Sequence, residues 1–167
     1  NGVTVMVGAT TYGPYAIAAG GHMELKYDNV LGGPAVVRIP GGLLAGAELT
    51  VSERTLYMGS FNENLAVDKV DAGSSYAFTW YDNQPAWGMM SDWIGIVNVD
   101  ETDAIVNVYI NDMVTPAITR TITPGAVDIF QMPTIVTNGP VKVVAQGGKK
   151  IITSQRVLYL NSFNEII

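Results

Sequence analysis

Arginine is followed nine residues later by glutamate at two places in the sequence, as Arg54 with Glu63 and as Arg156 with Glu165. Each arginine stands two residues before a leucine, so on a β-strand each guanidinium would lie on the same packed face as that leucine and would need a polar partner. A bidentate guanidinium–carboxylate pair would pin the strand to the returning segment. The alternative chemistry at either arginine is contact with an anion or a carbohydrate.

Asp100, Glu101 and Asp103 form the one acidic cluster with the oxygen ligands that Ca²⁺ prefers. The cluster lacks the regular D-x-D-x-D-G loop, and a solvated turn needs no metal, so we predict no bound metal or cofactor. His22 is the single histidine and there is no cysteine, which excludes disulfides and zinc sites built on thiolates. His22 is predicted to be a surface or edge residue.

Tryptophans form a second group of candidates. Trp80 and Trp93 are large enough to belong to a sandwich core, although exposed aromatic rings at this density could also stack on sugars. Trp87 lies in a loop with Met89 and Met90, and both residue types are enriched at interfaces. This loop is therefore the candidate surface contact, for a protein or for a glycan.

Other function classes are disfavoured. No nucleophile elbow, P-loop or paired-carboxylate cleft is recognisable, so the sequence predicts a protein that is not an enzyme. A net charge of -6, with nine lysines and arginines scattered along the chain, argues against nucleic acid. No long apolar run predicts membrane insertion. Charged residues make up only 14% of the chain, so much of the surface is neutral and suited to meeting other surfaces.

An internal repeat positions these residues. Residues 52–63 recur as residues 154–165 at a constant offset of 102, and eight of the twelve positions are identical. Upstream, Gly33-Pro34 matches Gly139-Pro140, and residues 3–7 match 106–110. The first copy has no counterpart of residues 66–105, so it starts in mid-domain. We therefore predict an incomplete first repeat over residues 1–65 and a complete second repeat over residues 66–167.

The local pattern predicts strands throughout. Val106, Val108 and Ile110 alternate with polar residues, as expected of a half-buried strand. Residues 141–146 and 149–160 flank Gly147-Gly148 and are predicted to form a hairpin. Frequent prolines and eighteen glycines leave no window for an amphipathic helix. The predicted fold is an all-β antiparallel sandwich.

Specific motifs between Tyr76 and Glu165 carry a resemblance: F-x-W-Y-D, D-W-x-x-x-x-N, T-I-x-P-G, G-P-V-x-V and a closing S-Q-R-V-L-Y-x-x-S-F-N-E. They resemble an immunoglobulin-like β-sandwich repeat that occurs in tandem in large secreted and cell-surface proteins of bacteria and archaea. The match covers the second copy throughout and the first copy from Val3 onward. The resemblance implies no enzymatic activity and a spacer, stalk, layer or adhesion role. The first copy departs from the pattern at Glu53, where the motif has Gln.

These observations predict an extracellular or cell-surface structural protein that forms a homo-oligomer or polymer, as a fibre, sheath or surface layer. The chain opens on Asn1-Gly2-Val3, as a processed or trimmed product would. A sandwich that lacks strands exposes unpaired backbone groups, which another subunit could pair. The predicted strand-exchange edge is Val3, Val5 and Val7. The alternatives are a strand just upstream of Asn1, a reduced self-sufficient fold, and a surface adhesion or glycan-binding module.

Overall fold

The structure is a computed structural model that describes residues 2–28, 30, 32–43, 47–57, 59–84, 90–137, 139–160 and 162–167. About half of the residues (49%) form β-strands and the described chain contains no α-helix, in agreement with the predicted all-β fold. Four antiparallel sheets are present. The chain divides into two compact units, Asn1–Val51 and Ser52–Ile167.

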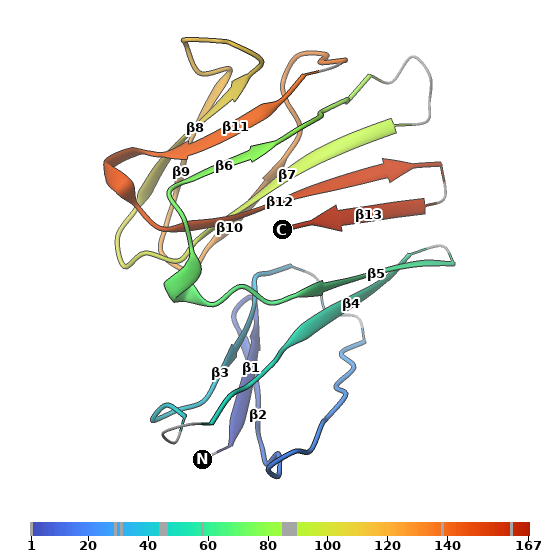
Figure 1. The fold of residues 1–167 in the computed structure, drawn as a ribbon, viewed down its shortest axis with the longest axis vertical. Coiled ribbons are helices and arrows are strands. Elements are labelled where there is room, and N and C mark those ends of the chain that lie inside the picture. Colours follow the sequence, from blue (N-terminus) through green and yellow to red (C-terminus); the bar gives the residue numbers. More distant parts are fainter. Residues whose placement is uncertain are drawn as a thin grey trace. The chain divides into compact units, whose positions relative to one another are not determined.

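The second unit holds most of the strands (Figure 1). Its strands are β4 (Ser52–Tyr57), β5 (Ser60–Leu65), β6 (Ser75–Phe78), β7 (Met90–Asn98), β8 (Ala104–Ile110), β9 (Ile118–Ile122), β10 (Val127–Phe130), β11 (Val141–Ala145), β12 (Ile151–Tyr159) and β13 (Ser162–Ile166). The described connections include two short 3₁₀ turns, η1 (Lys69–Asp71) between β5 and β6 and η3 (Gln146–Gly148) between β11 and β12. This compact unit begins at Ser52, before the predicted boundary between the repeats at residue 65. The repeat boundary itself stays a prediction.

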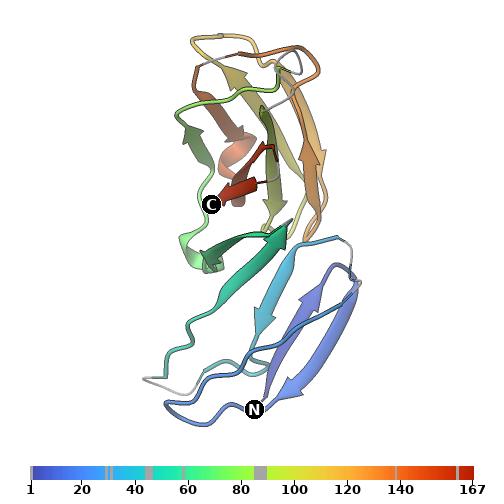
Figure 2. The same cartoon turned by 90° about the vertical axis from the view of Figure 1, so that its right-hand side faces the viewer.

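Two four-stranded sheets form the sandwich of the second unit, in the orders β6-β11-β8-β9 and β10-β7-β12-β13 (Figures 1 and 2). Inward residues alternate along β8 and β11, as the pleat requires. The core between the sheets includes Ile94, Ile96, Val106, Val108 and Tyr81, none of which is exposed to solvent. This burial supplies the main driving force for folding of the unit.

β11 and β12 do not form the predicted hairpin. β11 pairs with β6 and β8 in one sheet, whereas β12 pairs with β7 and β13 in the other. The connection η3 therefore crosses from sheet to sheet. Gly147 and Gly148 both have positive φ, at 64° and 69°, which lets the chain make this crossing without the strain that a side chain would cause.

The described residues of the first unit form one sheet in the order β2-β1-β3, made of β1 (Val3–Val7), β2 (Thr10–Tyr15) and β3 (Ala35–Arg38). β1 pairs with β2 along one side and with β3 along the other. Val3, Val5 and Val7 therefore lie in the middle of the sheet, and the strand-exchange edge predicted there is corrected: the edges are β2 and β3. Val3 and Val5 are the only buried residues among those described in this unit.

This sheet repeats part of the second unit. Its order β2-β1-β3 matches β9-β8-β11, because Val7 lies opposite Ala35 as Ile110 lies opposite Val141. The turns also agree: the amide of Gly8 donates to the carbonyl of Pro34 (3.1 Å), and that of Asn111 donates to the carbonyl of Pro140 (2.9 Å). Gly8 and Asn111 both adopt left-handed backbone conformations, with φ of 57° and 52°.

Residues 1–65 include no counterpart of β7, and the segments equivalent to the two neighbours of β7 pair differently in the described chain. In the second unit β7 is a central strand that pairs with both β10 and β12. Gly20-Gly21 corresponds to Pro124-Gly125, which sets an offset of 104 residues and makes residues 23–26 the equivalent of β10. These residues form no strand. The equivalent of β12 is β4, which forms a two-stranded sheet with β5.

Candidate functional site

The two arginine–glutamate pairs lie in equivalent hairpins. Arg54 is opposite Glu63 on β4 and β5, and Arg156 is opposite Glu165 on β12 and β13. Directly opposite residues project from the same face of an antiparallel pair, which brings each guanidinium to its carboxylate. In both pairs the shortest N–O distance is 2.8 Å.

Each arginine donates two hydrogen bonds to the same carboxylate oxygen of its glutamate. Arg156 donates through Nε (3.2 Å) and Nη2 (2.8 Å) to Oε2 of Glu165, and Arg54 donates in the same way to Oε2 of Glu63. The other carboxylate oxygen accepts from a serine hydroxyl, Ser154 in one hairpin and Ser52 in the other. Each predicted pair is thus present, with both N–H bonds on one oxygen, and the serine extends it to a three-residue polar cluster.

Solvent exposure separates the two clusters. The side chains of Arg54 and Glu63 are 55% and 40% exposed, against 38% and 18% for Arg156 and Glu165. The expected packed face is therefore absent around Arg54. Hydrogen bonds from Arg54 and then from Ser52 lower the pKa of Glu63. Such an exposed pair contributes little to stability because water screens it.

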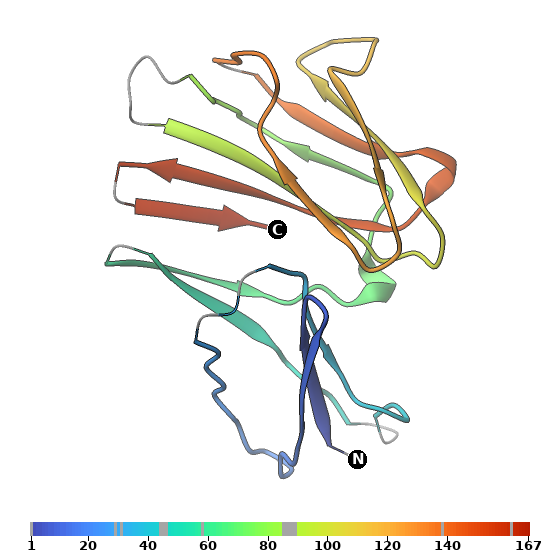
Figure 3. The ribbon, with the colours of Figure 1, turned by 180° about the vertical axis from the view of Figure 1, so that it is seen from behind.

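The two hairpins lie side by side within the second unit (Figure 3). Asn62 Nδ2 donates to Oδ1 of Asn164, its own counterpart in the repeat, at 2.6 Å. The amide of Phe163 donates to the hydroxyl of Ser60 (3.4 Å), and the ring of Phe163 meets that of Tyr57 edge-on with centroids 5.8 Å apart. This contact shows that equivalent parts of two repeats can pack on one another.

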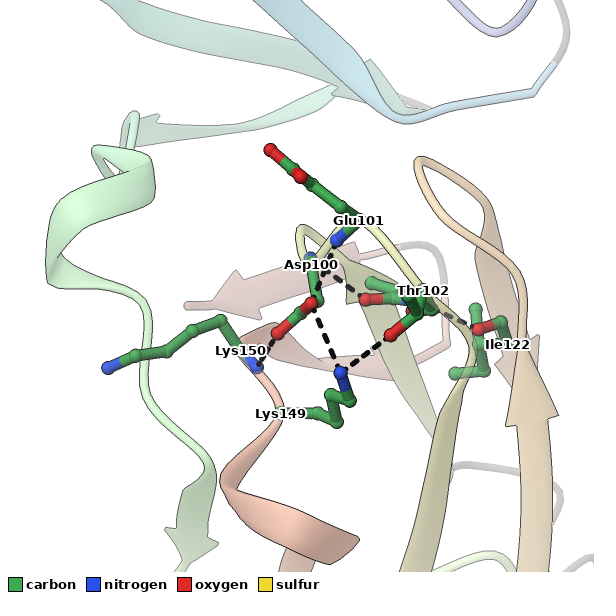
Figure 4. Close-up of polar contacts among 7 residues, drawn as sticks. Asp100, Glu101, Thr102, Ile122, Lys149 and Lys150 are labelled. Carbon is green, nitrogen blue, oxygen red and sulfur yellow. Dashed lines mark hydrogen bonds and ion pairs between the residues drawn. The ribbon is translucent and has the colours of Figure 1, made fainter.

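The acidic turn is held together by lysines (Figure 4). Asp100 accepts hydrogen bonds from the backbone amides of Lys150 and Glu101 and from Nζ of Lys149, which also donates to the hydroxyl of Thr102. These bonds, led by that from the Lys150 amide, lower the pKa of Asp100. The side chain of Glu101 points away from the cluster. The ammonium group of Lys149 thus lies where a bound cation would have to compete with it.

Metal ligands do not converge elsewhere in the described chain. Within residues 2–84 and 90–167, apart from the few undescribed positions, no three His, Cys, Asp or Glu side chains are placed to hold a metal ion. His22 is exposed, as predicted for a surface residue. Asp103 lies next to β8 and is also exposed.

A buried polar centre at Asp92 was not predicted. Asp92 is fully buried, and its Oδ2 accepts hydrogen bonds from the amide of Asp82 (2.8 Å) and from Nε2 of Gln155 (3.0 Å). Gln155 also donates to the carbonyl of Trp80 (2.6 Å), so it ties the F-x-W-Y-D segment to β12. Burial raises the pKa of Asp92. The sequence could have indicated this centre, because the motifs D-W-x-x-x-x-N and S-Q-R both place a polar side chain at an inward position of a strand.

The aromatic residues are arranged differently from the prediction. Trp80 is 49% exposed and Trp93 is half-buried, whereas the fully buried aromatic residue is Tyr81. The hydroxyl of Tyr81 accepts from the amide of Met132, and burial raises its pKa to about 12. The prediction that Trp80 and Trp93 belong to the core is therefore wrong.

The candidate loop contact falls largely outside the described chain. Trp87 and Met89 lie outside the described residues, and Met90 begins the backbone of β7.

No protein-family model, curated protein or solved structure matches this chain. No helix in the described part of the chain has the length and apolar composition needed to cross a membrane.

Proposed function

We propose that this chain is an extracellular or cell-surface structural protein, not an enzyme, that assembles into a fibre, sheath or surface layer. Its subunits are joined by strands that one polypeptide supplies to another. Such head-to-tail strand addition does not close on itself, and it therefore generates a polymer.

One observation carries the proposal. The sheet β2-β1-β3 has the same order as β9-β8-β11, yet only Val3 and Val5 are buried in the described part of its unit. In the second unit the equivalent strands are covered by a whole second sheet. A small unit with so little buried apolar surface gains stability by association.

Exposed apolar side chains in the first unit support the same function. Met23, Leu25 and Leu43 are 43%, 36% and 50% exposed. β2 and β3 are edge strands among the described residues, and edge strands offer backbone N–H and C=O groups to an incoming strand. Apolar side chains together with open edges are the features that favour association over solvation.

The test is the state of the purified chain across a range of concentrations, by sedimentation velocity and negative-stain electron microscopy. Filaments or sheets are expected at high concentration, and Leu43→Lys should weaken them. Val114→Lys is the matched control, because Val114 is 94% exposed in the second unit. A monomer at every concentration would contradict the proposal.

Trp80 favours a second candidate function, a surface adhesion or glycan-binding module. An indole ring that is 49% exposed can stack on the flat face of a sugar ring. Binding to a glycan array that is lost in Trp80→Ala would support this function. A blank array would remove it.

A further inference from the structure

β2 places two tyrosines on the buried face of the sheet in the first unit. Tyr12 lies opposite Val5 of β1, and Tyr15 lies opposite Val3. The two tyrosines are three residues apart, whereas the valines are two apart. The extra residue of this bulge-like irregularity turns both phenol rings to the face of the valines. The rings therefore lie beside the two side chains that are buried in the described part of the unit.

Tyr27 joins these tyrosines from the segment that follows β2. Residues 16–28 form no strand, and Tyr27 is the one residue from Ala18 to Asp28 that is not exposed. Its ring lies against that of Tyr12, with centroids 4.2 Å apart and planes inclined by 32°. Its hydroxyl donates a long hydrogen bond to the hydroxyl of Tyr15 (3.5 Å). Burial, and then this bond, raises the pKa of Tyr27 to about 12, so its phenol is neutral at physiological pH.

The second unit has other residue types at the equivalent positions. On β9, Ile118 and Arg120 lie opposite the valines of β8 that correspond to those of β1. At the offset of 104 residues, Gln131 stands where the first unit has Tyr27. The tyrosine cluster thus belongs to the copy whose described residues form one sheet and not two.

A small unit with little core needs a further source of stability. Domains of this size commonly obtain it from disulfides, a structural metal, cyclisation or association. This chain has no cysteine, and no described group of side chains could hold a metal ion. A covalent bond between Tyr12 and Tyr27 closes a loop of residues 12–27, which restricts the unfolded chain as a disulfide does.

We propose that Tyr12 and Tyr27 form a site of oxidative cross-linking, at which the two rings are joined as dityrosine. The co-reactant is hydrogen peroxide, used by a haem peroxidase. Each phenol loses one hydrogen atom, as a proton and an electron, and the two ring radicals join through carbons ortho to the hydroxyls. The hydrogens on these carbons then move to the oxygens, which restores both phenols. One carbon–carbon bond forms, and the two hydrogen atoms removed reduce one hydrogen peroxide to two waters.

The geometry selects this pair of tyrosines. Coupling requires ring carbons that touch, because the new bond joins one carbon of each ring. The rings of Tyr12 and Tyr27 are in contact, whereas Tyr15 reaches Tyr27 through the hydroxyl. Tyr12 and Tyr27 are also partly exposed, so an oxidant can reach them. The inference goes beyond the proposed function, because it concerns a single chain and does not depend on assembly.

The experiment treats the full chain, at high dilution, with hydrogen peroxide and a haem peroxidase. We expect the blue fluorescence of dityrosine in a product that still migrates as a monomer on a denaturing gel. Cleavage after Glu24 and Glu48 separates Tyr12 from Tyr27, so mass spectrometry should find residues 1–24 joined to residues 25–48. The mass of the joined pair should be lower than the sum of the two peptides by two hydrogens, and fragmentation should place the bond at Tyr12.

Conservative variants locate the reaction. Tyr12→Phe and Tyr27→Phe keep a packed ring but remove the phenol, and each should abolish the cross-link. Tyr15→Phe should retain it, because the Tyr12 and Tyr27 rings still touch. Tyr57→Phe is the matched control in the second unit, because Tyr57 is 39% exposed and its ring meets a phenylalanine, Phe163. This variant should also cross-link like the wild type.

The inference would be overturned by an absence of dityrosine, by a product that persists in Tyr12→Phe, by a bond mapped to Tyr15, or by products that form only between chains. A protein that forms the internal cross-link but stays monomeric at every concentration would support this site and contradict self-assembly. Polymers of a protein that forms no internal cross-link would support the proposed function and overturn this site.

Discussion

Equivalent strands occur twice in this chain, and a second sheet covers them in one copy only within the described residues. Val108 on β8 is fully buried between two sheets, and its counterpart Val5 on β1 belongs to a unit with a single sheet. Phe163 is 6% exposed, against 64% for Phe61. The residue types hardly differ, so the different burial comes from the neighbouring strands and not from local sequence.

β7 makes the difference. It joins β10 to β12 at the centre of a sheet, and it supplies Asp92, Ile94 and Ile96 to the core. In the described part of the first copy, residues 23–26 form no ladder and β4 has β5 as its one ladder partner. A central strand such as β7 therefore supports both of its neighbours, because each β-ladder needs both members.

The largest effect is expected in the paired cores. Val108→Ala should lower the free energy of unfolding of the second unit by about 2–3 kcal/mol, because it leaves a cavity between two sheets. Val5→Ala should cost less than half as much in the first unit of the monomer, where one sheet is present. Backbone amide NMR signals followed through a denaturant titration report on both units. Equal losses would break the comparison.

The ion pairs provide a smaller contrast. Arg156→Ala should destabilise the second unit by about 1–2 kcal/mol, because Glu165 is only 18% exposed and would lose its cation. Arg54→Ala should leave the thermal transition of the chain unchanged, since both partners are well solvated. Thermal melts of the two variants beside the wild type check this, and a loss in Arg54→Ala as large as that in Arg156→Ala would contradict it.

A pH-dependent contrast follows from Asp92. Its pKa in the folded state is raised above 3.8 by burial, so the folded chain holds this proton more tightly than the unfolded chain. The stability that protonated Asp92 contributes is present below pH 3.8 and is lost as the pH rises through the raised pKa. Wild type should therefore lose stability relative to Asp92→Asn over this range. Denaturation of both proteins at several pH values measures the difference, and a constant gap would be the contrary result.

Chelation of calcium should have the smallest effect. Asp100 is already engaged by Lys149 and by two backbone amides, so the melting temperature should not change when a chelator is added. A fall of several degrees that added calcium reverses would show that the acidic turn holds a metal.

The sequence predicted the fold class well because strand periodicity and repeat spacing are local signals. The offset of 102 between the closing motifs matches the register of β4–β5 and β12–β13 residue by residue. The pairing of Arg156 with Glu165 follows from the same register. Such features depend on short stretches of chain, and a single sequence contains them.

Predictions that depended on distant strands were less accurate. Val3, Val5 and Val7 look like an edge strand in the sequence alone, but β3, some thirty residues on, pairs with that side of β1. Gly147-Gly148 has the composition of a hairpin turn, although the chain changes sheets there. Trp80 is exposed because Tyr81, the next residue, takes the inward position. The pairing partner of a strand, and which of its residues face the core, depend on tertiary context.

Hydrogen–deuterium exchange of the whole chain, compared between β3 and its counterpart β11 in dilute and in concentrated protein, tests the central claim most directly. The amides of β11 should be protected at every concentration, because β6 and β8 flank this strand. Those of β3 that point away from β1 should exchange rapidly in dilute protein and become protected as the chain assembles. Protection of β3 in the dilute monomer equal to that of β11, or assemblies in which β3 still exchanges rapidly, would contradict the account.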